Sequence, residues 1–442
     1  MSKKEEKNVI MENLVSLCKR RGFVFQGSEI YGGLAGTWDY GPFGVAVRNS
    51  IKALWWKKFV TDRDDMYGVD AAILMNPRVW EASGHVGGFS DPLVECKKCK
   101  HRFRADQLPD RKKCPDCGGD LGEEKQFNMM FKTNIGANED ASSVSYLRPE
   151  TAQGMFVNFK NIIDTFHPKL PFGLAQIGKA FRNEIAPRDF IFRLRELEQM
   201  EIEYFVDPRD PKKVDEIFDA LFDEQMDFLK QLGLSAKKIH KIEVPDTDRA
   251  HYSKRSVDTE FDFPFGQKEL LGLAYRTDFD LKAHATASGV DLSYFDEETK
   301  ERFVPHCIEP TFGVDRLFLA VLSDAYTEDE IDDEKRVYLK LSPALAPYRV
   351  AVFPLLKNKP QLVEKAEEIY KIIKKEIPNA TFDDNGNIGK RYRRQDEIVT
   401  PVCVTIDFDT VEKDAGVTIR DRDSGKQERV QIDVLIKYLK GV

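Results

Sequence analysis

The stretch Phe181-Arg-Asn-Glu-Ile185, which continues to Arg195-Glu-Leu-Glu-Gln-Met-Glu-Ile-Glu203, decides the fold of this chain. Around each end the residues alternate with a period of two, which predicts the two strands of a hairpin. Ala186-Pro-Arg-Asp189 has the composition of a turn between them. Such a hairpin can direct Arg182 towards a phosphate and a set of carboxylates towards an amine. The stretch therefore predicts a site that brings ATP and an amino acid together.

The composition limits the class of protein. A chain of 442 residues should hold about two to four domains, and 41% apolar residues are ample for their cores. With a net charge of −8, binding of a nucleic acid would need a local basic face. No segment approaches the ~18 consecutive apolar residues of a membrane span. The polar start, Met1–Lys7, has no apolar signal core behind it, so we expect a cytoplasmic protein without a membrane anchor.

Four of the seven cysteines form two Cys-x-x-Cys pairs, Cys96 with Cys99 and Cys114 with Cys117. Disulfides are disfavoured in a reducing compartment, and two closely spaced pairs are typical of a structural zinc site with four thiolates. Two redox pairs or unliganded thiols are the alternative, but a redox pair rarely occurs doubled. We therefore expect a zinc-ribbon-like insertion over residues 92–125.

Two adjacent tryptophans mark the helix expected from Gly44 to Val60, which follows a helix over 9–21 and a glycine-rich stretch. Trp55 and Trp56 cannot share one face of a helix. One is expected in the core and the other at a second surface, such as a subunit interface. Two partly buried tryptophans within one domain are the alternative.

Beyond the hairpin, strand and helix patterns follow each other. A helical surface insertion is expected at 207–257, with its helix over 208–240. The next expected elements are strands over 260–266 and 269–280, and then a strand, a turn and a long helix over 306–322. The acidic run Glu328–Glu334 is predicted to be a solvated linker or loop.

A domain boundary is expected near Leu341–Pro347, where proline and serine cluster. The pattern then changes to that of an α/β unit at 345–442, large enough to fold alone. Its expected elements are strands at 349–355, 379–383, 401–407 and 416–421, with helices at 360–376 and 431–440.

Seven short motifs occur along the chain in a fixed order: Ser28-Glu-Ile-Tyr-Gly-Gly33, Asp39-Tyr-Gly-Pro42, Leu147-Arg-Pro-Glu-Thr-Ala-Gln-Gly154, Phe181-Arg-Asn-Glu-Ile185, Glu198-Gln-Met-Glu201, Arg249-Ala-His-Tyr-Ser253 and Glu309-Pro-Thr-Phe-Gly-Val-Asp-Arg316. Each is weak alone, but their joint occurrence in this order is specific. With them the chain resembles the class II aminoacyl-tRNA synthetases, and among these the dimeric glycyl-tRNA synthetases. The resemblance covers nearly the whole chain.

The resemblance implies an α+β catalytic domain at 1–340, with an antiparallel sheet and flanking helices. Motif 1, which builds the homodimer interface in the family, matches the helix from Gly44 to Val60 and a strand ending at Pro77. Motif 2 matches residues 181–205, and motif 3 matches Glu309–Leu322. The C-terminal unit resembles the α/β anticodon-binding domain of this class.

The implied reaction joins glycine to ATP, forming glycyl-adenylate and pyrophosphate, and then transfers glycine to the 3′ end of tRNA(Gly). Synthesis of diadenosine tetraphosphate is implied as well. The protein's task is positioning and charge neutralisation. Arg182 suits the α-phosphate, Arg316 the γ-phosphate and Glu184 the adenine amino group. Glu269 and Glu309 suit the Mg²⁺ that accompanies ATP.

Glycine has no side chain to recognise, so selectivity must come from excluding substituents at Cα and holding both charged ends. The residues assigned to glycine are Arg104, Glu150, Glu201, Arg276, Glu309, Thr311 and Gly313. Those assigned to ATP are Arg182, Asn183, Glu184, Phe192, Arg195, Glu196, Leu197, Glu269, Leu270, Gly313 and Arg316. Glu203 should share the face of Glu201, with surface exposure as the alternative. For Arg193 and Arg195, a structural ion pair is an equal alternative.

Three positions depart from the family pattern. Thr311 stands where Ser is usual, which adds a methyl group to the pocket. Leu197 stands where a Phe stacks on adenine, and Val399 replaces a Gly in the anticodon domain. None of the three removes a charged group.

Lys390-Arg-Tyr-Arg-Arg394 is a basic patch with an aromatic residue, which suits a phosphate backbone and a stacked anticodon base. A solvated helix face with one packed tyrosine is the alternative.

Two competing hypotheses remain at this level. A synthetase-like nucleic-acid-binding or polymerase-accessory protein would keep the fold and lose motif residues. The presence of Arg182, Glu184, Glu201, Glu309 and Arg316 favours an enzyme. A synthetase for threonine, proline or serine would need room for a side chain, and a pocket crowded with glutamates favours glycine.

Overall fold

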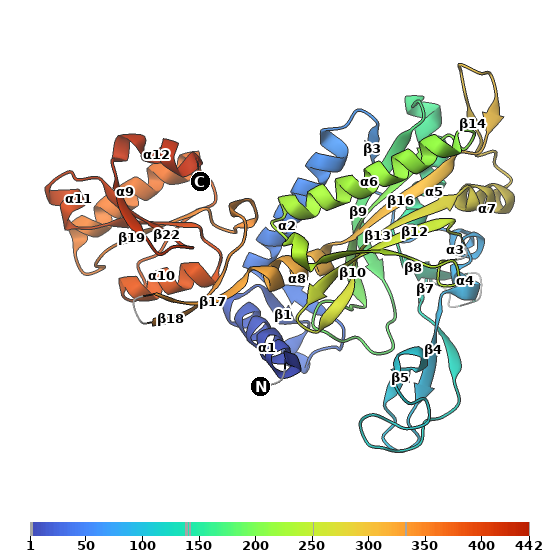
Figure 1. Cartoon of the computed structure of the whole chain (residues 1–442), viewed down its shortest axis with the longest axis horizontal. Helices are drawn as coiled ribbons and strands as arrows, with labels where there is room; N and C mark the ends of the chain where they lie inside the picture. Colours follow the sequence, from blue (N-terminus) through green and yellow to red (C-terminus); the bar gives the residue numbers. More distant parts are fainter. Residues whose placement is uncertain (1–2, 138–139, 141–142, 251, 332–333, 442) are drawn as a thin grey trace.

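The computed structural model describes residues 3–137, 140, 143–250, 252–331 and 334–441. Met1 and Ser2 of the polar start, and His251 of one quoted motif, lie outside the described residues. Figure 1 shows two bodies, a large one that carries the N-terminus and a smaller one that carries the C-terminus. In the described part of the chain, no helix combines the length and apolarity that a membrane crossing requires.

The large body is built around a seven-stranded sheet with the order β11-β12-β13-β16-β10-β9-β3. Every neighbouring pair is antiparallel except β3 with β9. The strands are β3 Met66–Gly68, β9 Phe172–Phe181, β10 Glu196–Val206, β11 Ile239–Glu243, β12 Arg255–Phe263, β13 Gly266–Thr277 and β16 His306–Gly313. The predicted antiparallel sheet with flanking helices is confirmed, and the quoted hairpin is its β9–β10 pair. The first strand ends earlier than predicted, because β9 stops at Phe181 and Arg182–Ile185 lie in the connecting loop.

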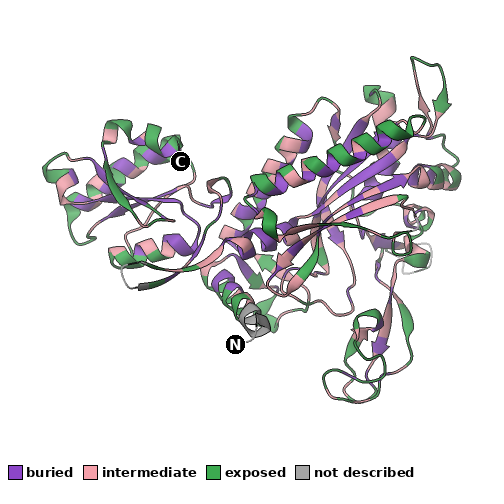
Figure 2. Ribbon diagram, viewed as in Figure 1, coloured by how far each residue is buried: buried purple, intermediate pink, exposed green. Residues whose placement is uncertain are grey.

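Helices cover the two faces of this sheet, and their bounds are α1 Lys3–Arg21, α2 Pro42–Trp56, α5 Ala152–Phe166, α6 Pro211–Gln231, α7 Phe279–Ser288 and α8 Val314–Ala325. On one face, Trp55 of α2 and Phe228 of α6 pack against Phe312 at ring distances of 5.8 and 5.7 Å. On the other face, Phe156 of α5 packs against Phe205. The strands between them are largely buried (Figure 2). This second face carries the site, because α5 and α7 leave part of it open.

Two expectations about the first motif need correction. The strand does not extend to Pro77, since β3 ends at Gly68 and Pro77 begins helix α3 Pro77–Ala82. Asn76 caps that helix by accepting a hydrogen bond from the Arg78 amide at 3.0 Å, and an Asn cap followed by proline is a helix start. The expected helix over 44–60 is α2 followed by a π-helical turn, Lys57–Thr61. Trp55 is fully buried and Trp56 reaches the surface, as predicted for adjacent tryptophans.

The helix expected over 208–240 ends earlier, because α6 stops at Gln231 and the strand β11 begins at Ile239. The acidic run is not a linker. It forms part of an antiparallel hairpin of β17 Tyr326–Ile331 and β18 Glu334–Leu339. Asp329 and Arg336 pair across the two strands, with Arg336 Nε 2.8 Å from Asp329 Oδ1. An opposite charge on the facing strand offsets the acidity of the run. Asp332 and Asp333 lie outside the described residues.

The ribbon that carries the four cysteines projects from the large body (Figure 1). Its sheet has the order β5-β4-β6, formed by β4 Ser90–Glu95, β5 Arg102–Arg104 and β6 Lys125–Asn128. Shorter elements complete this body: β1 Val24–Gln26, β2 Trp38–Tyr40, α4 His85–Gly88, β7 Phe131–Asn134, β8 Val144–Leu147, β14 Tyr294–Phe295 and β15 Arg302–Phe303.

The small body is a five-stranded sheet with the order β20-β19-β21-β22-β23, which confirms the predicted α/β unit. Its elements are β19 Val350–Pro354, α9 Pro360–Glu376, β20 Ala380–Phe382, α10 Ile388–Glu397, β21 Val402–Ile406, α11 Phe408–Glu412, β22 Val417–Asp421, β23 Gln427–Val430 and α12 Ile432–Lys440. Val399, which precedes β21, has φ +78°. A β-branched side chain is strained in this left-handed conformation, whereas glycine adopts it freely, which explains the glycine usual there.

Most residues of the basic patch on α10 bind other residues of the small body. Arg391 is buried and donates to the carbonyls of Asp384 and Gly386, both at 2.8 Å. Arg394 pairs with Asp383, and the Tyr392 hydroxyl lies 2.7 Å from Thr405 Oγ1. The packed tyrosine of the alternative is present, but the helix face is not solvated throughout, because Arg391 is buried.

Buried charges at the end of α10 fasten the small body to the large one. Asp396 accepts two hydrogen bonds from Arg420, at 2.7 and 2.9 Å, and lies 3.3 Å from Arg336 of β18. Next to it, Glu397 pairs with Arg20 and Arg21 of α1. Arg420 belongs to the small body itself, so the link to the large body consists of the buried contact of Asp396 with Arg336 and the pairs of Glu397 with α1.

Candidate active site

A cavity of about 300 Å³ opens on the face of the central sheet that α5 and α7 leave free. Most of the residues predicted to bind ATP line it, together with three assigned to glycine: Arg104, Arg182, Glu184, Phe192, Leu197, Glu269, Leu270, Thr311, Gly313 and Arg316. A larger hollow of about 760 Å³ lies between α5, α6 and the β14–β15 hairpin, away from all of these side chains. The smaller cavity is the better candidate, because charged groups of several elements converge on it.

Arg182 stands at the end of β9 with its charge available to a ligand. Its Nε donates to the carbonyl of Pro149 at 3.0 Å, and its guanidinium lies 5.6 Å from the centre of the Phe89 ring. Within the described ranges, no carboxylate lies within ion-pair distance of Arg182. An arginine that is oriented but not neutralised can bind a phosphate.

Arg316 approaches the same cavity from the start of α8. Its guanidinium lies 4.4 Å above the ring of Phe192, and Nη1 lies 3.0 Å from Glu269 Oε2. Phe263 and Phe265 hold the Phe192 ring through edge contacts at 5.2 and 5.3 Å. Glu269 is half exposed at the rim. A phosphate could therefore replace this carboxylate as the partner of Arg316.

Three of the residues assigned to ATP do not line the cavity. Arg195 donates to the carbonyls of Ala35, at 2.6 Å, and Glu184, at 3.1 Å. Glu196 pairs with Lys179 at 2.9 Å on the opposite face of the sheet, since side chains alternate along a strand. The backbone of Asn183 is bound to Met129. In the described part of the chain Arg195 is held by backbone carbonyls and not by a carboxylate, whereas Arg193 makes the ion pair offered as the alternative, with Glu184 at 3.5 Å in the cavity wall.

Beside the cavity lies an acidic chamber, by which we mean Glu150, Glu201 and Glu309 together with Arg276. Glu201 of β10 accepts hydrogen bonds from the backbone amide of Thr151, at 3.1 Å, and from its hydroxyl. Thr311 lies directly opposite Glu201 on β16. Glu201 and Glu309 occupy neighbouring strands and point to the same face, so the alternation of β10 and β16 builds the chamber.

Arg276, which was assigned to glycine, is buried among carboxylates. It makes two hydrogen bonds of 2.8 Å to Asp280 and one of 2.9 Å to Glu309 Oε2. The ring of Tyr252 lies 3.9 Å from the guanidinium and covers it. This paired geometry makes Arg276 a support of the chamber, and it balances part of the negative charge.

The chamber carries more carboxylates than its cation can balance. Burial raises the pKa of Glu309 to about 8, against the opposing effect of Arg276, and Glu201 and Glu150 add to the rise. Burial and the charge of Glu150 also raise the pKa of Glu201. For Glu150, burial acts upward but the neighbouring His85 and Arg276 bring its pKa well below its usual range. A ligand cation that enters here would relieve the repulsion and stabilise the ionised forms.

Glu203 corrects one alternative, because it is fully buried and not at the surface. It shares the face of Glu201, as predicted. The Cys307 thiol donates to Glu203 Oε2 at 2.9 Å, and burial raises the pKa of Glu203 well above its usual value. It lies beneath the chamber as a structural acid.

The ribbon reaches the cavity through Arg104. Arg104 Nη1 lies 2.8 Å from Asp91, and Nη2 lies 2.7 Å from Asp106. At the hairpin tip, Arg188 also donates to Gln107 of the ribbon at 2.8 Å. The insertion thus touches both the cavity and the loop that holds Arg182.

Two side chains of the site were missed by the sequence. His85 Nε2 lies 3.3 Å from Glu150 Oε2, but a lone histidine among glycines has no spacing that predicts a role. Tyr252 falls inside a quoted motif, yet only the fold brings its ring over Arg276.

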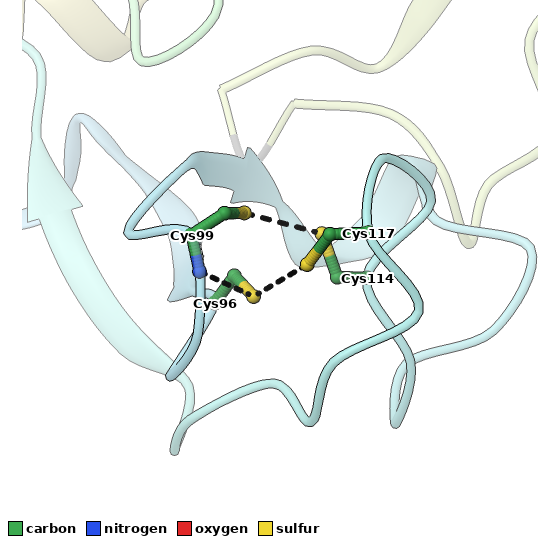
Figure 3. Close-up of side chains that lie close together, drawn as sticks. All are labelled: Cys96, Cys99, Cys114 and Cys117. Carbon is green, nitrogen blue, oxygen red and sulfur yellow. Dashed lines mark hydrogen bonds between the residues drawn. The ribbon is translucent and has the colours of Figure 1, made fainter.

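The four cysteines of the ribbon converge as predicted (Figure 3). Their sulfur atoms lie within 4.8 Å of one another. Cys96 Sγ is 3.6 Å from Cys117 Sγ, and Cys99 Sγ is 3.7 Å from Cys114 Sγ. A tetrahedral zinc with ~2.3 Å bonds needs thiolates roughly 3.8 Å apart. The backbone amide of Cys99 lowers the pKa of Cys96 to about 6. The donor set and spacing therefore fit zinc.

Two family models match the chain. A tRNA synthetase class II core domain (G, H, P, S and T) matches residues 131–325, and an anticodon-binding domain matches 349–441. A glycine–tRNA ligase of Caldanaerobacter subterraneus is 51% identical, over 98% of this chain and 98% of its own length. The glycine–tRNA ligase of Clostridium tetani is 51% identical over 97% of both chains. That of Treponema denticola is 50% identical, over 99% of this chain and 98% of its own.

We predict that Leu197→Phe lowers the KM for ATP by several-fold at most and leaves the KM for glycine little changed. Leu197 lines the cavity, where an aromatic ring could stack on adenine. Stacking contributes roughly 1–3 kcal/mol per base, part of which leucine already supplies. Steady-state kinetics and the melting temperature check this. An unchanged KM for ATP with a reduced melting temperature would show that the side chain packs inward, where a larger ring overpacks the core.

Proposed function

The chain belongs to the glycine–tRNA ligases of the class II aminoacyl-tRNA synthetases, and on that premise we propose how its residues divide the reaction. It activates glycine with ATP to glycyl-adenylate and pyrophosphate, and then transfers glycine to the 3′ end of tRNA(Gly). The observation that carries the proposal is the position of the acidic chamber directly beside the cavity of Arg182 and Arg316.

Glycine enters with its ammonium group among Glu150, Glu201 and Glu309. The crowded carboxylates attract this cation and leave no room for a side chain at Cα, and the Thr311 methyl narrows the space further. A larger amino acid would have to displace buried carboxylates from their hydrogen bonds, which is costly. Threonine, proline and serine are therefore excluded by the same groups that bind glycine.

ATP lies in the cavity with its α-phosphate at Arg182 and its γ-phosphate at Arg316. The glycine carboxylate attacks the α-phosphorus in line, and the bond to pyrophosphate breaks. Arg182 stabilises the negative charge that develops there. Arg316 exchanges its ion pair with Glu269 for contact with the departing pyrophosphate. Glu184 accepts a hydrogen bond from the adenine amino group, while Phe192 and Leu197 supply apolar contact.

Mg²⁺ bound with ATP would supply further neutralisation of the phosphates. Glu269 fits it, because its carboxylate is half exposed at the cavity rim and hard cations prefer carboxylate oxygen. Glu309 fits less well, since Arg276 occupies Oε2. We therefore assign Glu309 to glycine and Glu269 to the metal.

We assign to the remaining domains the roles of the corresponding domains in the related ligases. Residues 1–340 act as the catalytic domain, with the ribbon at 92–125 and the helical insertion at 207–257 inside it. Residues 345–442 bind the anticodon of tRNA(Gly). Diadenosine tetraphosphate would arise when a γ-phosphate oxygen of a second ATP attacks the phosphorus of the adenylate and glycine leaves. All of these activities belong in the cytoplasm, where tRNA is charged.

The first test is pyrophosphate exchange with each of the twenty amino acids. We expect exchange with glycine alone. Arg182→Gln should reduce its rate by about 10²–10³-fold, as for other groups that stabilise charge in a transition state. Arg302→Gln is the matched control, since this exposed arginine of the β14–β15 hairpin lies away from the cavity. Exchange with another amino acid but not glycine would overturn the assignment.

A second test concerns the ribbon, where we propose one structural zinc. Protein prepared without chelator should contain about one zinc per chain, and Cys99→Ser should lose most of it, because a closed site needs four ligands. Cys18→Ala removes a buried thiol elsewhere and should keep the metal. Metal-free protein with the same fold and activity would contradict the proposal.

The third test addresses the homodimer. Trp56 lines an apolar surface hollow with Ala53 and Ile177, and Ile30 and Tyr31 are 90% and 87% exposed. Apolar side chains this exposed favour a subunit contact. Sedimentation velocity at micromolar concentration should show a dimer, and Trp56→Lys should shift it towards monomer. Val434→Lys, on exposed α12, should not. A monomeric parent chain would refute the interface.

A further inference from the structure

A short helix beside the acidic chamber places a histidine against one of its carboxylates. His85 begins α4, and its ring lies between the rings of Trp80 and Phe89 at 5.5 and 5.4 Å. The Ser83 hydroxyl lies 2.8 Å from its Nδ1. The side chain is 12% exposed. With one ring nitrogen held by Ser83 and both sides packed, the imidazole has a fixed orientation.

The other ring nitrogen of His85 points at a chamber carboxylate. Nε2 lies 3.3 Å from Glu150 Oε2, and Gln153 Nε2 donates to Glu150 Oε1 at 3.0 Å. One donor on each oxygen prevents rotation of the carboxylate group. Each oxygen still has a second lone pair with which it can accept a hydrogen bond from a ligand. The pair of donors therefore sets the plane in which Glu150 presents its charge.

Gln153, the second donor, is itself held on both sides. Its Nε2 also donates to Asp280 at 2.9 Å, and its Oε1 lies 2.7 Å from His284 Nε2. Asp280 in turn binds Arg276, which binds Glu309. A continuous buried network thus runs from Ser83 through His85 and Glu150 to the far wall of the chamber. A hydrogen-bond network of this kind restricts the movement of the functional groups, so they stay in place during the reaction.

Helix α4 also meets the phosphate side of the site. Phe89, which packs against His85, lies 5.6 Å beneath the guanidinium of Arg182. Asn128, at the end of the ribbon strand β6, donates to the carbonyls of His85 and Val86 at 3.2 and 2.9 Å. The ribbon therefore fixes α4 from outside, and α4 stands between the carboxylate that holds glycine and the arginine that holds the α-phosphate.

We propose that His85 is a positioning residue for glycine, which orients Glu150 towards the substrate ammonium through the contact of Nε2 with Oε2. The inference rests on the proposed function, because Glu150 is assigned to glycine there. His85 does not touch substrate or exchange protons with it. Its effect is confined to how well the chamber receives the ammonium group.

The experiment compares His85→Asn with His85→Gln. The amide nitrogen of glutamine can occupy the position of Nε2 and still donate a hydrogen bond to Glu150. The asparagine side chain is shorter, so its amide nitrogen does not reach that position. His85→Asn should raise the KM for glycine about 10- to 100-fold, the usual effect of losing a hydrogen bond to a charged group. The KM for ATP and kcat should change little, because the contact is equal in ground and transition states. His85→Gln should stay within about threefold of the parent chain.

His167→Asn is the matched control. This histidine is exposed and ends α5 at φ +49°, a conformation that asparagine adopts well, so its kinetics should be unchanged. A parent chain without glycine-dependent exchange would overturn the proposed function itself. With an active parent, an unchanged KM for glycine in His85→Asn would overturn the role of His85. Equal losses for both substrates, together with a lower melting temperature and no rescue by His85→Gln, would show a purely structural histidine and would also overturn it.

Discussion

The rest of the site depends on one electrostatic constraint, which is the burial of three glutamates around a single arginine. Glu150, Glu201 and Glu309 repel one another in a buried region, and burial pushes the pKa of Glu309 to about 8. Arg276 cannot balance them, because Asp280 claims part of its charge. Such an arrangement is unfavourable when empty and becomes favourable when a cation enters. In the proposed function this cation is the ammonium group of glycine.

The strands and helices around the site fix the positions of these glutamates. Alternation along β10 and β16 puts Glu201 and Glu309 on one face, and the N-terminus of α5 supplies the Thr151 amide that holds Glu201. On the opposite face, Phe312 packs against α2 and α6, so the strands cannot shift without disturbing the core. The packing of the surrounding core offsets the repulsion among the buried glutamates. Functional sites commonly retain destabilising groups in this way.

Much of this was predictable from sequence where a short-range rule governs the outcome. Period-two alternation predicted β9 and β10, the apolar helical repeat predicted α9 with its bounds, and cysteine spacing predicted the sulfur cluster. Failures occurred where distant residues decide. Arg336 pairs with the acidic run, which forms a hairpin, and the carbonyl of Ala35 binds Arg195. The contact of His85 with Glu150 joins residues far apart in the chain, and no spacing could reveal it.

The charge of the chamber can be tested with glycolate, which has the carboxylate and the size of glycine but a hydroxyl in place of the ammonium. The measurement is its inhibition constant against glycine in pyrophosphate exchange. If the buried carboxylates recognise a cation, the neutral hydroxyl leaves them uncompensated, which costs about 3–5 kcal/mol. The inhibition constant should then exceed the KM for glycine by at least about 100-fold. Glycolate that competes as well as glycine would contradict the account, because recognition would then rest on size alone.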